Sequence, residues 1–334
     1  MPRRFFALLT AFLILFAPLA RADLGDVADL AILSQWDERF QDETFRYGTA
    51  YFRYGGCGPA SVANGIIAAL DITDQDQAAG ILRDVLYLLT KSLPKKNRVF
   101  ISHLNYLTAT KGVLAELNER YPWLNRAVRD FGGTILYHNG FINAKSLPAL
   151  LPTANDIPVV IHGDFTSDNR WTTIREVIQT LTDAGYEDAR IVLAFLPAGT
   201  YDTQSPFRSG TVGHYLSICV PMADFLETGE FYVLDSLPRA LYKEAFGQDE
   251  TFITQYDFAG PQKFFNSLDE FNTLFRVERV TDTIVKPVPI GEALKALNSA
   301  REDGAVPLDG LLPYLTGFMG FNGTSHIFIT LPAR

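Results

Sequence analysis

The sequence predicts an α+β protein, with helices gathered in its first half and strands in its second. Apolar residues recur at helical spacing up to about residue 125, whereas short β-branched and aromatic runs bounded by turn residues begin at Gly133. No internal repeat and no Pro/Gly/Ser-rich linker divides the 334 residues. Because 47% of the residues are hydrophobic and only 20% are charged, a disordered or collagen-like chain is excluded.

The N-terminus has the layout of a secretory signal peptide. Arg3 and Arg4 precede an uncharged run over residues 5–20, and Ala20-Arg21-Ala22 supplies small residues at a cleavage site. The run is shorter than the ~20 residues of a membrane span. We therefore predict a signal peptide over residues 1–22, cleavage after Ala22, a secreted or periplasmic location and no stable membrane span once the signal is removed. An uncleaved anchor stays open as the alternative.

The elements after the signal follow from hydrophobic spacing. Residues 23–44 are expected to form a helical lead-in, and the small, apolar run 59–70, with a proline near its start, predicts a buried helix. A polar stretch over 71–77 leads into further helical patterning up to about residue 125, with a break at Pro94 and Lys95. Further helices are predicted at 171–184, 268–275 and 290–301, and strands at 133–137, 157–162, 191–196, 214–220, 230–234 and 326–331, with a turn at 163–164.

The chain has only two cysteines, and the setting of Cys57 suits a nucleophile. An exported protein stapled by disulfides carries several pairs. Cys57 instead follows Gly55 and Gly56 and opens the predicted buried helix. The positive end of a helix dipole favours a thiolate, and the Cys57 backbone N–H is placed to stabilise an oxyanion. The alternative is inert packing.

A histidine and a carboxylate stand where a base and its orienting group belong. His214 begins one predicted strand and Asp235 ends the next. If these strands pair in antiparallel fashion, the two residues become neighbours, and the carboxylate fixes the imidazole tautomer. A core histidine and a turn-capping aspartate beside Ser236 are the alternatives. His326 also opens a strand and remains a second candidate base, although no strand ending in a carboxylate follows it.

Cys219 is expected to be a packing residue. It lies five positions beyond His214 on one strand, and an odd spacing sends two side chains to opposite faces. We therefore expect Cys219 to point away from the cleft that contains Cys57, and no disulfide between the two cysteines.

Cys57-Gly58-Pro59-Ala60-Ser61 and Gly213-His214-Tyr215 resemble the papain-like cysteine peptidase superfamily. They look most like its bacteriocin-processing branch, which cleaves double-glycine leaders; the phytochelatin synthases are similar as a second choice. The resemblance implies a papain-like domain over 45–240, in which the cysteine-bearing helix packs on an antiparallel sheet. Residues 241–334 are then a C-terminal α/β extension packed on it. The resemblance also implies that Cys57, His214 and Asp235 act as nucleophile, base and orienting residue.

One position departs from that superfamily. Its members have a glutamine about six residues before the cysteine, which donates to the oxyanion, whereas this chain has Tyr51 there. Tyr51 or Tyr54 is a candidate replacement, because a phenolic O–H can also donate.

The function expected from these residues is that of an exported thiol hydrolase, which cleaves a peptide or amide through an acyl-enzyme on Cys57. Acyl transfer by the same triad is one alternative, and a binding or scaffold protein that kept the fold without turnover is another. We expect no cofactor and no metal, since the histidines lack zinc-ligand spacing. The net charge of −9, without a basic stripe, argues against a nucleic-acid partner.

Overall fold

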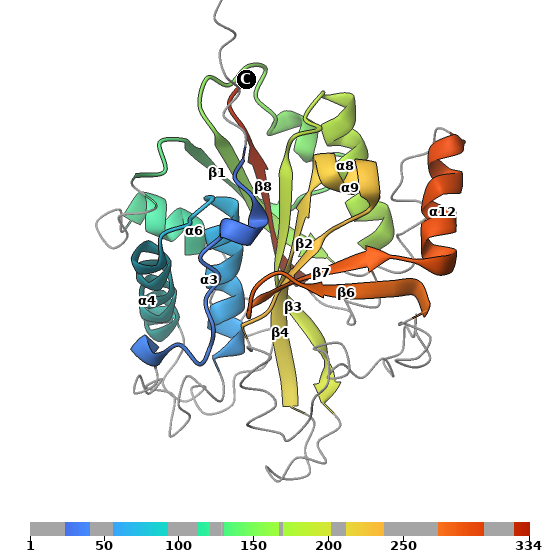
Figure 1. Ribbon diagram of the computed structural model, residues 1–334. Coiled ribbons are helices and arrows are strands. Elements are labelled where there is room, and N and C mark those ends of the chain that lie inside the picture. Colours follow the sequence, from blue (N-terminus) through green and yellow to red (C-terminus); the bar gives the residue numbers. More distant parts are fainter. Residues whose placement is uncertain are drawn as a thin grey trace, which may run out of the picture.

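The protein has a mixed α/β architecture built on one eight-stranded, mostly antiparallel sheet (Figure 1). This computed structural model describes residues 24–40, 56–92, 113–120, 128, 130–166, 170–201, 212–236, 273–303 and 324–334. Its combination of an antiparallel sheet with separate helices agrees with the predicted α+β class. The predicted signal peptide, Tyr51 and Tyr54 lie outside the described residues.

The strands follow the order β1-β2-β8-β3-β4-β5-β7-β6, and only β1 and β2 pair in parallel. Their bounds are β1 (Thr134–Phe141), β2 (Val159–Thr166), β3 (Arg190–Tyr201), β4 (Val212–Pro221), β5 (Tyr232–Leu234), β6 (Phe275–Arg279), β7 (Ile284–Pro289) and β8 (Thr324–Leu331). The last strand of the chain, β8, is inserted between β2 and β3. The segment after residue 241 therefore contributes β6, β7 and β8 to the same sheet.

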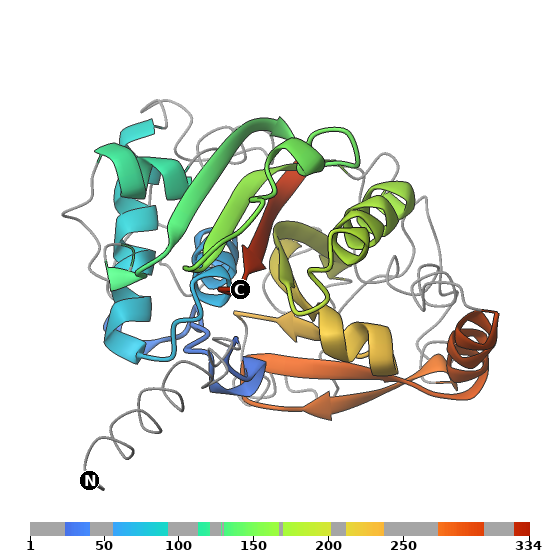
Figure 2. The same ribbon diagram turned by 90° about the horizontal axis from the view of Figure 1, so that it is seen from above.

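Helices cover both faces of the sheet, and each layer has its own core. One face carries α3 (Cys57–Ala69), α4 (Gln75–Ser92) and α6 (Val113–Ala115), and the other carries α8 (Arg170–Asp183), α9 (Met222–Thr228) and α12 (Gly291–Glu302) (Figure 2). Alternate strand residues serve the two layers: Val192 and Cys219 pack with α3, whereas Ile191 and Val220 pack in the opposite core.

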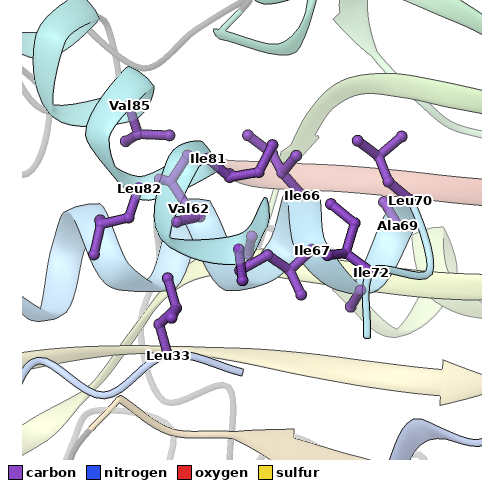
Figure 3. Packing of buried hydrophobic residues seen from close by; sticks show 14 of the residues in the cluster. Leu33, Val62, Ile66, Ile67, Ala69, Leu70, Ile72, Ile81, Leu82 and Val85 are labelled. Atoms are coloured by element: carbon purple, nitrogen blue, oxygen red, sulfur yellow. The ribbon is translucent and has the colours of Figure 1, made fainter. Parts of the chain in front are cut away.

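Helix α3 is the central element of its layer, and it confirms the helix predicted at 59–70. It begins two residues earlier, at Cys57, and every residue after Cys57 is buried. A helix that is apolar on all sides must be covered on all sides. The sheet covers one side, and α4 and the segment before α3 cover the others. Val62 and Ile66 pack against Ile81, Leu82 and Val85, and Leu33 approaches from the opposite side (Figure 3).

Gly65 sets how closely α3 approaches the sheet. A Cβ atom at this position would lie 2.4 Å from Cβ of Ala194 and 3.1 Å from Cε2 of Phe328. Both distances are shorter than ordinary van der Waals contact, so only glycine permits this approach.

The predicted helical lead-in is not a continuous helix. Residues 24–40 contain two single-turn 3₁₀ helices, η1 (Val27–Asp29) and η2 (Glu38–Phe40), with extended chain between them. The extended part is held by α3, because the Leu33 amide donates to Asn64 Oδ1 (2.8 Å) and Asn64 Nδ2 donates to the Leu33 carbonyl (3.0 Å). Tertiary hydrogen bonds therefore replace the helix that the apolar spacing predicted.

The other element predictions were mostly confirmed, with strands that are longer than expected except for β5, which is shorter than the predicted 230–234. The predicted turn at 163–164 was wrong, because β2 continues through it to Thr166. The connection between β4 and β5 contains the unpredicted helix α9, and β6 and β7 were missed. Of the helix predicted at 268–275, only the last residues are described, and Phe275 already belongs to β6. Within the described ranges, no helix combines the length and hydrophobicity of a membrane span.

Gly65→Ala should lower the free energy of unfolding, because the added methyl group collides with Ala194. Overpacking of this kind costs about 1–3 kcal/mol, which urea denaturation followed by circular dichroism will detect. The double variant Gly65→Ala/Ala194→Gly removes the nearer collision and should recover part of the loss. Equal stability of Gly65→Ala and the unmodified protein would contradict the close approach.

Candidate functional site

Cys57 is the first residue of α3, and its thiol is free and partly exposed. Gly56 is the N-cap residue, and its carbonyl accepts the Ala60 amide at 2.9 Å. The first amides of a helix have no intrahelical partner and carry partial positive charge. The thiol therefore stands at the end of the helix that favours a thiolate and a developing oxyanion.

Ser61, one turn after Cys57, fixes α3 to two strands. Its Oγ donates to the Leu216 carbonyl of β4 (2.7 Å) and accepts the Phe195 amide of β3 (2.8 Å). Ser217 Oγ lies 3.0 Å from Ser61 Oγ and donates to the Ser61 carbonyl at 2.8 Å. All these groups are buried, so their hydrogen bonds specify the position of the helix as well as stabilise it.

Phe195 occupies a bulge in β3 that faces Ser61. The β3–β4 register shifts between Leu193 and Leu196, and Phe195 has a φ of 61°. A left-handed conformation is rare for an aromatic residue and persists only where the surroundings enforce it. Here the bond to Ser61 Oγ and a ring stack on Tyr215, at 4.2 Å between centroids and 6° between planes, hold it in place.

Tyr215 is the side chain that the structure couples to Cys57. Burial, and to a smaller extent the negative charge of the Cys57 thiolate, raise the pKa of Tyr215 to about 12. A phenol under these conditions keeps its proton and acts as a hydrogen-bond donor. Sequence reasoning used Tyr215 only as part of a motif. The signal that could have identified it is its two-residue spacing from Ser217, which places both residues on the same face of the strand.

Asp235 follows β5 directly and is buried, with 4% of its surface exposed. Its amide donates to the Thr283 carbonyl at 2.9 Å. The next residue, Ser236, accepts the Gln35 amide at 2.7 Å through its carbonyl and donates from Oγ to Gln35 Oε1 at 3.3 Å. The turn that bears the carboxylate is thus fixed from both sides. Gln35 was missed, because no local pattern indicates a partner 201 residues away.

The strands that carry His214 and Asp235 are adjacent and antiparallel, as predicted. Ser217 pairs with Leu234, so continuing this register brings Asp235 opposite Leu216, two residues from His214. The backbone of His214 pairs with Ala198 of β3.

The expected orientation of Cys219 was wrong, although its packing role is confirmed. Cys219 is fully buried, and it packs in the same core as α3 rather than facing away from the layer that contains Cys57. Burial raises the pKa of its thiol to about 11, an effect that nearby Arg190 opposes.

Strand alternation assigns the position of His214 to the same side as Leu216 and Ile218, opposite the α3 layer.

His326 lies on the α3 side of the sheet, but within the core. It is 1% exposed, and its imidazole lies 6.4 Å from the ring of Phe195, the same ring that stacks on Tyr215. Its backbone pairs with that of Asp164 in β2, an acidic residue that precedes it in the chain. His162 Nε2 lies 3.4 Å from His326 Nδ1.

No family model, curated protein or solved structure matches the chain. Among the residues that the structure describes, no cluster of three or more histidine, cysteine or acidic side chains is arranged to hold a metal ion. The functional assignment therefore rests on the geometry around Cys57.

Ser61→Ala should destabilise the protein by about 1–3 kcal/mol, because it leaves the buried Phe195 amide without its acceptor. Urea denaturation measures the loss. Ser34→Ala is the matched control, since Ser34 Oγ accepts the Trp36 amide in a part-buried turn. Equal effects of the two substitutions would refute the role of Ser61.

Acid should destabilise the fold through His162. Burial, and then the charge of His326, lower the pKa of His162 well below 6.5, so the folded state resists a proton that the unfolded state accepts. Stability is present above pH 6.5 and is lost as pH falls below it, by up to about 1.4 kcal/mol per pH unit until the folded pKa is reached. Tyr137, Phe328 and His326 surround the imidazole.

His162→Gln should therefore lose less unfolding free energy than the unmodified protein between pH 7 and pH 5, as measured by urea denaturation at each pH. Parallel stability curves for the two proteins would show that His162 does not cause the acid sensitivity.

Proposed function

We propose that the protein is an exported thiol hydrolase of papain-like fold, which cleaves a peptide or amide bond through an acyl-enzyme on Cys57. The observation that carries this proposal is the placement of Cys57. A partly exposed thiol begins a fully buried helix, and that helix is bound to the central strands one turn later through Ser61. A cysteine used only for packing has no need of exposure at a helix N-terminus.

The reaction follows from the residues around this thiol. Cys57 Sγ attacks the carbonyl carbon, and its proton passes to His214. The Cys57 backbone N–H, with a second donor, stabilises the oxyanion. The tetrahedral intermediate collapses as His214 protonates the leaving amine, and water then releases the acyl group by the reverse sequence. Asp235 orients the imidazole and compensates its charge. Acyl transfer differs only in that an amine takes the place of water.

The fold supports the papain-like assignment, and strand alternation sets one condition on it. A cysteine-bearing helix on an antiparallel sheet, with His214 and Asp235 on adjacent strands, is the arrangement that the resemblance implies. The position of His214, however, has the opposite parity to Tyr215, which lies on the side of Cys57. Tyr215 pairs with Pro197 and His214 with Ala198 in unbroken register, so the triad requires a local rearrangement of β4 that brings the imidazole to the side of Cys57.

A binding or scaffold protein without turnover is the second candidate function. The position of His214, on the other side of the strand from Tyr215, favours it. If His214 stays on the side of Leu216, the thiol has no base within reach in β4. The two candidates differ in the reactivity of the thiol, which can be measured without knowledge of the substrate.

Iodoacetamide should alkylate Cys57 rapidly at pH 6 if His214 activates it, because the thiolate is the reactive form. His214→Ala should slow the reaction at pH 6 by about tenfold or more, and Asp235→Asn by less. Mass spectrometry of peptides, with labelling times from pH 5 to pH 9, identifies the modified cysteine and its rate.

Cys219 is the internal control, since its buried thiol has a pKa of about 11 and should stay unlabelled below pH 9. Labelling of Cys57 that rises only above about pH 8, with no effect of His214→Ala, would overturn the catalytic triad. The protein would then be a binding module.

A further inference from the structure

Helix α3 and strand β4 run side by side in the same direction, which fixes the neighbour of Cys57. Ser217 contacts Ser61. Further along, Cys219 is within electrostatic reach of Arg190, whose Nη1 donates to the Ala68 carbonyl near the end of α3. One helical turn rises about 5.4 Å and two strand residues about 6.6 Å. One turn before Ser61 is Cys57, and two residues before Ser217 is Tyr215, so these two stand side by side.

The ring of Tyr215 is held in place before any substrate binds. It stacks face to face on Phe195, whose backbone is locked in the bulge by Ser61 Oγ. Tyr215 is half-buried and packs against the core that contains α3. A donor that is fixed in advance costs no reorganisation when charge develops, which is the condition for oxyanion stabilisation.

The electrostatics agree with this geometry. The thiolate charge of Cys57 contributes to the raised pKa of Tyr215, so the phenolic oxygen lies within the field of the reacting sulfur. With a pKa of about 12, the phenol remains protonated at any pH at which a thiol enzyme works. It is thus a protonated phenol near the thiol.

We propose that the phenolic O–H of Tyr215 donates the side-chain hydrogen bond to the oxyanion formed when Cys57 attacks a carbonyl carbon. The proposal rests on Cys57 as the nucleophile, and it does not depend on which residue is the base. It replaces Tyr51 and Tyr54, the donors expected from the sequence, with a residue from β4.

Two probes of Cys57 separate this role from every other. With p-nitrophenyl acetate, the thiolate attacks the carbonyl carbon, a tetrahedral oxyanion forms, and p-nitrophenolate leaves with the electron pair of the broken C–O bond to give S-acetyl-cysteine. With iodoacetamide, the thiolate displaces iodide and no oxyanion forms. An oxyanion donor affects the first rate and leaves the second unchanged.

The experiment measures both rates on the mature protein and on Tyr215→Phe, which keeps the ring and its stack on Phe195. Acylation should slow by roughly 10²-fold, the loss typical for one oxyanion donor, while alkylation of Cys57 stays the same. Tyr232→Phe is the matched control. Tyr232 is also half-buried against the α3 core, and burial also raises its pKa, but Cys57 is not among the causes. It should change neither rate.

Three results overturn the proposal. Equal slowing of both reactions means that Tyr215 acts on the thiol itself, and no change in either means that it has no role. A loss with Tyr232→Phe that matches the loss with Tyr215→Phe means that both substitutions act through stability. Failure of the proposed function gives a different result, because Cys57 of the unsubstituted protein would then react slowly with both p-nitrophenyl acetate and iodoacetamide.

Discussion

The position of α3 depends on one buried hydroxyl. Ser61 Oγ bonds at once to the bulged amide of Phe195 and to the Leu216 carbonyl, so it joins β3 and β4 to the helix at a single point. A hydroxyl can do this because it both donates and accepts, and the bulge is needed because a regular strand would direct the Phe195 amide along the sheet. The bond lies one turn from Cys57, which gives the thiol a fixed height above the strands.

The far end of α3 is fixed by charge. Arg190 is 2% exposed, and its Nη1 reaches the Ala68 carbonyl at 3.0 Å and Asp71 Oδ1 at 2.7 Å. A buried guanidinium needs such partners, and the last carbonyls of a helix are natural acceptors for a cation. Because α3 is buried along its length and fixed at its C-terminal end, its partly exposed functional group is the one at its N-terminus. The twelve buried residues of α3 thus hold its first residue, Cys57, at the surface of the layer.

The sequence predicted the parts of this structure that depend on local pattern. Small apolar residues around Pro59 indicated α3, and alternating runs indicated β4, β5 and their pairing. The parts that were missed depend on contacts between distant residues. Extended chain at Leu33 is imposed by Asn64, the buried turn at Ser236 by Gln35, and the carboxylate beside His326 comes from β2. The side of the sheet that Cys219 faces was predicted wrongly, because alternation gives relative orientation only, and one tertiary contact is needed to assign the faces.

The contact between Ser217 and α3 limits what each residue of the Gly213-His214-Tyr215 segment can do. Once Ser217 is assigned to α3, Tyr215 shares its side, and the position of His214, next to it in unbroken register, falls on the other side. Tyr215 cannot substitute as the base, because a phenol with a pKa of about 12 holds its proton far too tightly to exchange it with a thiol near neutral pH. Turnover with His214 as the base therefore needs its imidazole brought to the α3 side, whereas binding of a carbonyl group needs only the helix amides and the phenol that already lie there.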